Sequence, residues 1–258
     1  MKVSQIASIL SLAALVLASL PAHATSVVCI RFPDSMGIAA DSRFTVRGGA
    51  VRNDKPPGEC KIIRAGKLLF SMTGFVKDPA RSYDAGQSVT RALEGSENFQ
   101  VATAAVTDMV TLALKKEVVR LRAEEPKLYE HFIETERGSL LEVLLVGFEE
   151  GTPKGALLGF KTASSSAGDL NVAVDRVTCP GNCDQRGVTM FVLGDRRPID
   201  AFLKSGKASF QGKGPEEIAK QLVDIVIAAH TPDVGPPVDV LRMDKDGATW
   251  IDRKEECQ

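Results

Sequence analysis

The order of apolar segments is the feature that most restricts how this chain can fold. Periodicity and turn residues predict strands, then two helices, more strands, two further helices and a closing pair of strands. This order can bury two sheets between two layers of helices within one domain, which predicts an α+β fold built as a four-layer α-β-β-α sandwich. A three-layer fold also satisfies the pattern, and periodicity alone does not choose between the two.

The expected elements follow from the apolar runs and the residues that bound them. Strands are expected at residues 26–32 and 36–40, joined by the turn Pro33-Asp34-Ser35, and then at 61–63, 68–72, 140–148, 155–161, 188–193, 238–243 and 248–251. Helices are expected at 80–93, with Asp78 and Pro79 as start residues, and at 101–123, 198–203 and 215–229. Residues 45–57, rich in Gly, Arg and Pro, are expected to form a loop.

The first 24 residues have the composition of a secretory signal peptide. Lys2 is the only charged residue before Arg31, and an apolar run at 6–20 is followed by Pro21 and Ala22-His23-Ala24. An uncleaved anchor is the alternative, but the run is shorter than the ~20 residues that a spanning helix needs. We therefore expect a signal peptide at 1–24 and one domain at 25–258, exported to the periplasm or secreted, without membrane attachment after cleavage.

Charge and cysteine content narrow the classes of partner. The 32 basic and 33 acidic side chains nearly balance, which gives no indication of a nucleic-acid or membrane-surface partner. An oxidising compartment permits disulfides, and an odd number of cysteines leaves at least one thiol unpaired in a monomer. The turn from Cys179 to Cys183 favours a local disulfide between these two; the remaining cysteines are Cys29, Cys60 and Cys257. With so few histidines we expect no metal, and no cofactor motif is present.

Excluding the conventional catalytic motifs leaves Thr25 as the candidate nucleophile. His131 and His230 accompany no serine-elbow or reactive-cysteine motif, so a conventional triad is hard to assemble. Cleavage after Ala24 would expose Thr25, which would then carry a hydroxyl and a free α-amine on one residue. Because an α-amine has an unperturbed pKa of about 7.7–8.0, it can act as general base for its own side chain.

The residues after Thr25 resemble a known family. Thr25-Ser-Val-Val-Cys-Ile-Arg-Phe, followed by Gly37-Ile-Ala-Ala-Asp-Ser-Arg43, resembles the start of mature proteasome β subunits and their bacterial relatives. Lys61-Ile-Ile-Arg-Ala-Gly-Lys-Leu-Leu-Phe-Ser-Met-Thr-Gly74 resembles the lysine-bearing strand of that family and the glycine turn after it. The resemblance covers residues 25 to about 78. It implies an exported bacterial-type relative with the fold of the N-terminal-nucleophile (Ntn) hydrolases.

The resemblance also implies roles for individual residues. Thr25 would be the nucleophile and Lys61 the cation that lowers the pKa of its α-amine, with Lys55 and Lys67 as weaker candidates. Asp41 would orient Lys61, and Gly74 would donate its N–H to the oxyanion. The alternative for Asp41 and Gly74 is that each is an ordinary turn residue without a catalytic role.

Two later positions depart from the family pattern. Asp195 stands where the family has a serine in a glycine turn, and Asp233 would keep an acidic role in a segment that lacks the usual serine. The resulting prediction is a threonine-type peptidase or amidohydrolase acting on a peptide or small amide, with a homo-oligomer implied by analogy. The alternative is a catalytically inactive exported scaffold or binding protein of the same fold.

Overall fold

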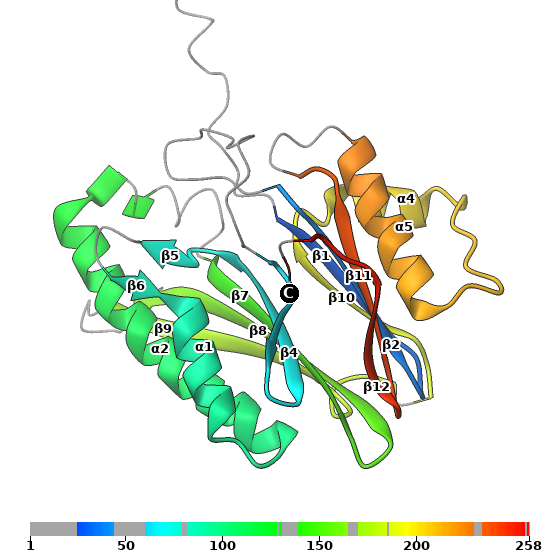
Figure 1. The fold of residues 1–258 in the computed structure, drawn as a ribbon. Helices are drawn as coiled ribbons and strands as arrows, with labels where there is room; N and C mark the ends of the chain where they lie inside the picture. Colours follow the sequence, from blue (N-terminus) through cyan, green and yellow to red (C-terminus); the bar gives the residue numbers. More distant parts are fainter. Residues whose placement is uncertain are drawn as a thin grey trace, which may run out of the picture.

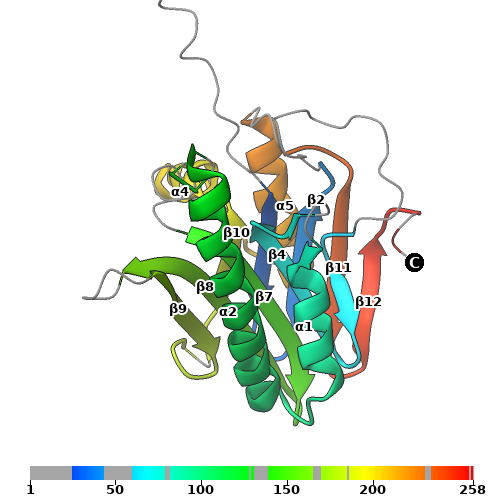
Figure 2. The same cartoon turned by 90° about the vertical axis from the view of Figure 1, so that its left-hand side faces the viewer.

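The computed structural model describes residues 25–43, 60–78, 82–127, 129–130, 139–164, 170–184, 186–229, 234–255 and 257. Two five-stranded sheets dominate this part of the chain (Figures 1 and 2), and every strand pair within them is antiparallel. The residues expected to form the signal peptide, 1–24, lie outside the described residues.

The first sheet contains the strands closest to both ends of the described chain. Its order is β10-β1-β2-β11-β12. The strands are β1 Ser26–Arg31, β2 Met36–Asp41, β10 Thr189–Gly194, β11 Val238–Asp244 and β12 Gly247–Asp252. Three of these strands, β10, β1 and β2, end or begin beside Thr25, so this sheet positions the start of the predicted mature chain.

The second sheet is built mainly from the long meander in the middle of the sequence. Its order is β3-β4-β7-β8-β9. The strands are β3 Ile63–Ala65, β4 Leu68–Gly74, β7 Ser139–Glu149, β8 Thr152–Ser164 and β9 Leu170–Cys179, and a separate two-stranded pair joins β5 Lys77–Asp78 to β6 Tyr83–Asp84.

Four helices longer than seven residues pack on the sheets in the described part of the chain. They are α1 Ala85–Glu94, α2 Phe99–Glu124, α4 Arg197–Lys204 and α5 Pro215–Ala228. Buried residues of α1 and α2 share a core with β4 and β7, whereas buried residues of α5 share a core with β1 and β11. Figure 1 shows these two groups of helices on opposite sides of the molecule.

A third core cluster lies where the two sheets face each other. It includes Val27, Cys29 and Ile38 from the first sheet and Leu69 and Leu144 from the second. Each of these side chains is almost fully buried, and alternation along the strands sends their neighbours to the helices instead. This alternation explains why β1 and β2 read as continuous apolar runs, since both of their faces are covered.

The predicted four-layer α-β-β-α sandwich of the Ntn-hydrolase type is wrong as a description of this chain. In the part of the chain that the structure describes, the fold is mostly antiparallel β-sheet, with 40% of residues in strands and 32% in helices. Apolar periodicity gives the order of strands and helices but not how far the helices cover the sheets, and in α4 only Ile199 is buried. On β12, Ala248 and Trp250 pack toward the second sheet and the side chains of the opposite face are exposed, so helices do not cover the whole of the first sheet.

Two element boundaries also differ from the prediction. Helix α1 begins at Ala85, not near Asp78, because Asp84 is its N-cap and accepts a hydrogen bond from Gln87 N at 3.0 Å. Asp78 instead pairs with Tyr83 between β5 and β6. Lys61 is not part of a strand, since β3 begins two residues later at Ile63.

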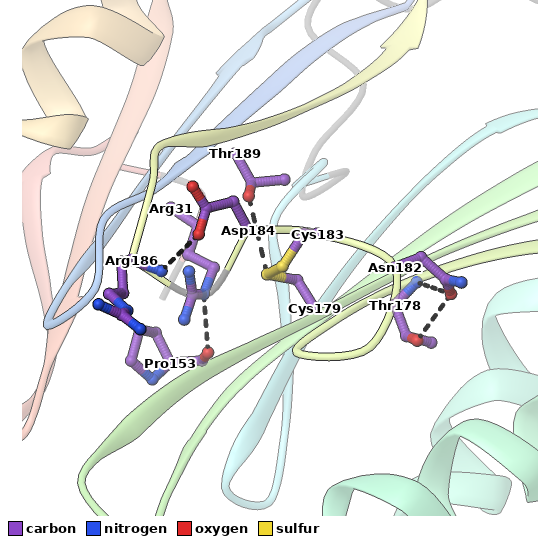
Figure 3. The surroundings of a disulfide bond; sticks show 9 residues. All are labelled: Arg31, Pro153, Thr178, Cys179, Asn182, Cys183, Asp184, Arg186 and Thr189. Carbon is purple, nitrogen blue, oxygen red and sulfur yellow. Dashed lines mark hydrogen bonds between the residues drawn. A yellow bond between two sulfur atoms is a disulfide. The ribbon is translucent and has the colours of Figure 1, made fainter.

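The local disulfide between Cys179 and Cys183 is confirmed (Figure 3). Asn182 Oδ1 closes the same turn by accepting hydrogen bonds from the backbone N–H and the hydroxyl of Thr178, at 3.3 and 3.2 Å. A second disulfide, which was not predicted, joins Cys60 to Cys257 across 197 positions of sequence. Cys29 is a free, buried thiol, in accordance with the odd number of cysteines.

Among the described residues no helix has the length and hydropathy to cross a membrane. The same residues contain no group of three or more His, Cys, Asp or Glu side chains that could hold a metal ion.

Candidate functional site

The buried carboxylate of Asp41 is the centre of the candidate site. Asp41 ends β2 and is fully buried. Its Oδ1 accepts hydrogen bonds from Ser26 N at 2.9 Å and from Lys61 Nζ at 2.6 Å. Its Oδ2 accepts from the backbone N–H groups of Arg43 at 3.0 Å and Gly235 at 3.2 Å. Four donors therefore satisfy the two oxygens, which fixes the carboxylate among four segments of chain.

The side chain of Lys61 is almost fully buried, which is unusual for a lysine. Its side chain is 10% exposed, and its ammonium forms an ion pair with Asp41. Burial lowers the pKa of Lys61, because desolvation disfavours the charged form, and Asp41 opposes this shift through its charge and its hydrogen bond. The predicted pair of Asp41 and Lys61 is thus brought together, although Lys61 reaches it from a bend and not from a strand.

The neighbourhood of Thr25 depends on the same carboxylate. Ser26 N, the amide that follows Thr25, and Lys61 Nζ donate to one oxygen of Asp41. The ammonium of Lys61 and the backbone N–H that follows Thr25 therefore contact the same carboxylate oxygen. Thr25 itself is partly exposed, which leaves it accessible to a second molecule.

Gly194 lets the chain approach Thr25 closely. It ends β10, pairs with Ser26, and has a φ of +83°, a conformation that favours glycine. A Cβ added at Gly194 would lie 1.6 Å from Thr25 O, so no other residue fits without displacing Thr25. This glycine is a positioning residue that the sequence analysis did not identify, since only the following Asp195 was noted.

The second sheet supplies a carboxylate to the same place. Glu142 of β7 lies opposite Thr73 of β4, and its Oε2 accepts a hydrogen bond from Gly194 N at 3.3 Å. Alternation along β1 puts Thr25, two residues before Val27, on the face turned to the second sheet. Glu142 was missed by the sequence analysis; a single acidic residue inside the apolar run 140–148 was the signal that could have identified it.

Gly74 ends β4 with a φ of +98° and packs tightly against β7. An added Cβ would lie 2.5 Å from Leu140 O. Phe75 N donates to Leu140 O at 2.7 Å, so by alternation the N–H of Gly74 points away from β7, toward the side of β4 that β3 pairs. In the described register β3 pairs with β4 only as far as Ile63 opposite Phe70, so within the described residues no strand pairs with Gly74 on that side.

Asp195 lies beside Thr25 in the sheet but is engaged elsewhere. Its carboxylate accepts hydrogen bonds from Arg197 Nε and the Arg197 terminal nitrogen at 2.8 Å each, and from Arg197 N at 3.1 Å. The hydrogen bond from Arg197 holds the pKa of Asp195 below its ordinary value, against the effect of partial burial. The side chain thus fixes the start of α4. Asp233, the other late acidic candidate, lies outside the described residues.

The described residues also contain a shallow cavity away from these groups. It has a volume of about 400 Å³ and is lined near the start of α2 by Phe99, Lys154, Arg176 and six other residues. None of the candidate residues lines it, and Glu149, which does, accepts a hydrogen bond from Phe99 N at 3.1 Å. The candidate site is therefore defined by Thr25 and its charged neighbours and not by this cavity.

Comparisons with known proteins do not place the chain in a family. No family profile matches it, and no curated protein matches it. Among solved structures it is similar to the Gly-1 mutant of Anbu from Hyphomicrobium sp. strain MC1, with 17% identity over 89% of this chain and 86% of that chain and a TM-score of 0.49.

This similarity corrects the recognition made from the sequence. The predicted identity as a proteasome β-subunit-like Ntn hydrolase, an exported bacterial-type relative, is not upheld: the comparison gives a distant structural likeness to a proteasome-like protein. At such identity and TM-score the likeness carries no argument about activity.

Proposed function

We propose that this protein is a hydrolase of peptide or small amide bonds that uses Thr25, exposed by removal of residues 1–24, as an N-terminal nucleophile. The observation that carries the proposal is the single Asp41 oxygen that accepts from both Ser26 N and Lys61 Nζ. It holds a buried cation next to the residue that would have a free α-amine. Removal of the signal peptide and export are parts of this proposal.

The chemistry assigned to Thr25 requires no cofactor. The positive charge of Lys61 lowers the pKa of the α-amine of Thr25, which favours the neutral amine as a base near neutral pH. The amine takes the proton from Oγ1 as that oxygen attacks the substrate carbonyl, and it returns a proton to the leaving amine. Water then releases the acyl group from the ester in a second step.

We assign the binding of the oxyanion to the edge of β4, where the N–H of Gly74 would donate a hydrogen bond to it. The N–H of Gly74 faces the side on which Lys61 lies, and a donor of this kind typically contributes about 2.7–4 kcal/mol to the transition state. Gly194 and Glu142 position the backbone around Thr25 and do not take part in the bond changes. Asp41 acts through Lys61, as a positioning residue.

Trapping with a peptidyl epoxyketone tests the proposal. This electrophile closes a ring with a hydroxyl and an α-amine of one residue, so a stable adduct requires both groups on Thr25. We expect an adduct on the N-terminal peptide of the exported protein, retained in Thr25→Ser and absent in Thr25→Ala. Ser26→Ala is the matched control, because it removes a neighbouring hydroxyl that is buried and has no hydrogen-bond partner.

Two results would contradict the proposal. An adduct that persists in Thr25→Ala would mean that another group is the nucleophile. A folded, correctly trimmed protein that forms no adduct, with peptidyl epoxyketones of several sequences, would favour the alternative of an inactive scaffold or binding protein.

A further inference from the structure

The end of the chain is fastened beside Lys61. After β12 the chain carries Lys254 and Cys257, which we call the C-terminal strap. Cys257 is 3% exposed and forms a disulfide with Cys60, the residue directly before Lys61. The covalent bond therefore ties the start of the lysine-bearing segment to the edge of the first sheet.

A second ion pair secures the strap. Asp239 of β11 is fully buried and lies opposite Ala40, the residue before Asp41. Its Oδ1 accepts a hydrogen bond from Lys254 N at 2.9 Å, and its Oδ2 lies 2.9 Å from Lys254 Nζ. The Cys257 sulfur is 3.8 Å from the same Oδ2. The proposed function assigns no role to this buried group of Asp239, Lys254 and the disulfide.

Burial is the largest influence on the pKa of Lys61 and lowers it. Three charged side chains add to this: Asp41 of β2 raises the pKa, Lys254 of the strap lowers it, and Asp239 of β11 raises it. In the trimmed protein the α-amine of Thr25 joins them from the start of β1. The strap thus contributes to the electrostatic setting of Lys61 through Lys254, and its bond to Cys60 attaches it next to Lys61 in the chain.

We propose that the C-terminal strap is a positioning element for Lys61, fastened by the Cys60–Cys257 disulfide, and that the site is competent only when this disulfide is formed. The inference rests on the proposed function, because it assigns a regulation to the same site. It makes the protein active in an oxidising compartment and inactive while its thiols are reduced.

The redox step is a disulfide exchange. Formation of the bond removes two electrons and two protons from the thiols of Cys60 and Cys257, and a donor disulfide takes them up to become a dithiol. Reduction is the reverse reaction, with a dithiol as the reductant. The released strap would let water reach Lys61 and would remove the charge of Lys254 from its surroundings.

The first experiment compares two disulfides in the exported, trimmed protein. In Cys60→Ser/Cys257→Ser we expect the rate of epoxyketone labelling at Thr25 to fall about tenfold or more, because the cation is no longer held in place. In the matched control Cys179→Ser/Cys183→Ser, which removes the remote disulfide, we expect a rate within about twofold of the parent. Intact mass with thiol alkylation confirms which bond is present.

The second experiment uses a readout that a loss of stability alone would not move. The labelling rate should fall at high pH as Lys61 loses its proton. Lys254→Gln removes a like charge, so this alkaline limb should move to higher pH, whereas Asp239→Asn removes an opposite charge and should move it to lower pH. We expect the two shifts to be in opposite directions, because the two substitutions remove charges of opposite sign.

The outcomes separate the two proposals. If the parent forms no adduct at Thr25, the proposed function fails. If the parent reacts but Cys60→Ser/Cys257→Ser reacts as fast, or if both charge variants leave the alkaline limb in place, the strap has no positioning role and the inference is overturned. Lys254→Gln and Asp239→Asn both keep the disulfide, so an alkaline limb that stays in place in both overturns the inference even if the serine variant does not fold.

Discussion

Replacement of Asp41 by asparagine removes the charge that holds the site together while keeping the shape of the side chain. Two of the four donors to Asp41 would then meet an amide nitrogen, and Lys61 would be left as a buried cation without its counter-ion. Removing one partner of a buried ion pair typically costs about 3–5 kcal/mol. We therefore expect Asp41→Asn to lower the free energy of unfolding by about that amount.

The structure predicts a smaller effect for the other partner. In Lys61→Met, Asp41 keeps three backbone donors, from Ser26, Arg43 and Gly235, so its charge remains partly compensated. We expect a loss of about 1–3 kcal/mol, the range for an incompletely satisfied buried polar group. The double variant should be no less stable than Asp41→Asn alone, because the unpaired ammonium is absent.

The assay is urea unfolding with both disulfides intact. Far-UV circular dichroism and the fluorescence of Trp250, the single tryptophan, should give coincident transitions, which would justify a two-state analysis. The reasoning is refuted if Lys61→Met costs as much as Asp41→Asn, or if the two losses simply add in the double variant.

Three further predictions follow from individual residues. Gly194→Ala should lower the free energy of unfolding by about 1–3 kcal/mol more than the control Gly206→Ala and should abolish labelling of Thr25. Gly206 has a similar positive φ of +71°, but an added Cβ there would meet no other atom. Equal losses in urea unfolding would contradict the close approach of Gly194 to Thr25. Cys29, whose pKa is raised by burial, should resist alkylation in the native protein and react on unfolding, as mass spectrometry can show. The labelling rate should rise with pH as the α-amine of Thr25 loses its proton. Because burial lowers the pKa of Lys61, the rate should begin to decrease at a pH below 10.4, which is about the ordinary pKa of a lysine. A rate that still rises above that pH would contradict the role assigned to Lys61.

Local patterns in the sequence predicted a large part of the secondary structure. The first hairpin and helix α5 were expected within a residue or two, because apolar runs and turn residues agree there. Strand β9 was missed because half of its side chains are exposed and its apolar alternation is confined to Leu170, Val172 and Val174. Helix α1 was started too early because Asp78 and Asp84 are both suitable N-caps, and the pairing of β5 with β6 decides in favour of Asp84.

The candidate site was predicted only in part, and the reason is its dependence on distant segments. Asp41 and Lys61 were expected to meet, and they do. Glu142 comes from the second sheet, and the disulfide of Cys60 joins positions 197 residues apart, so neither follows from local spacing. Charged residues from four segments converge only once both sheets are assembled.

The N-terminus of the exported protein decides whether Thr25 can supply both its hydroxyl and its α-amine to one reaction. The chain should be expressed with its own leader, recovered after export, and analysed by intact mass and N-terminal sequencing. We expect a chain that begins at Thr25, with its α-amine free beside Asp41 and Lys61. A folded protein that retains any residue ahead of Thr25 would contradict it, because the amine would then belong to another residue.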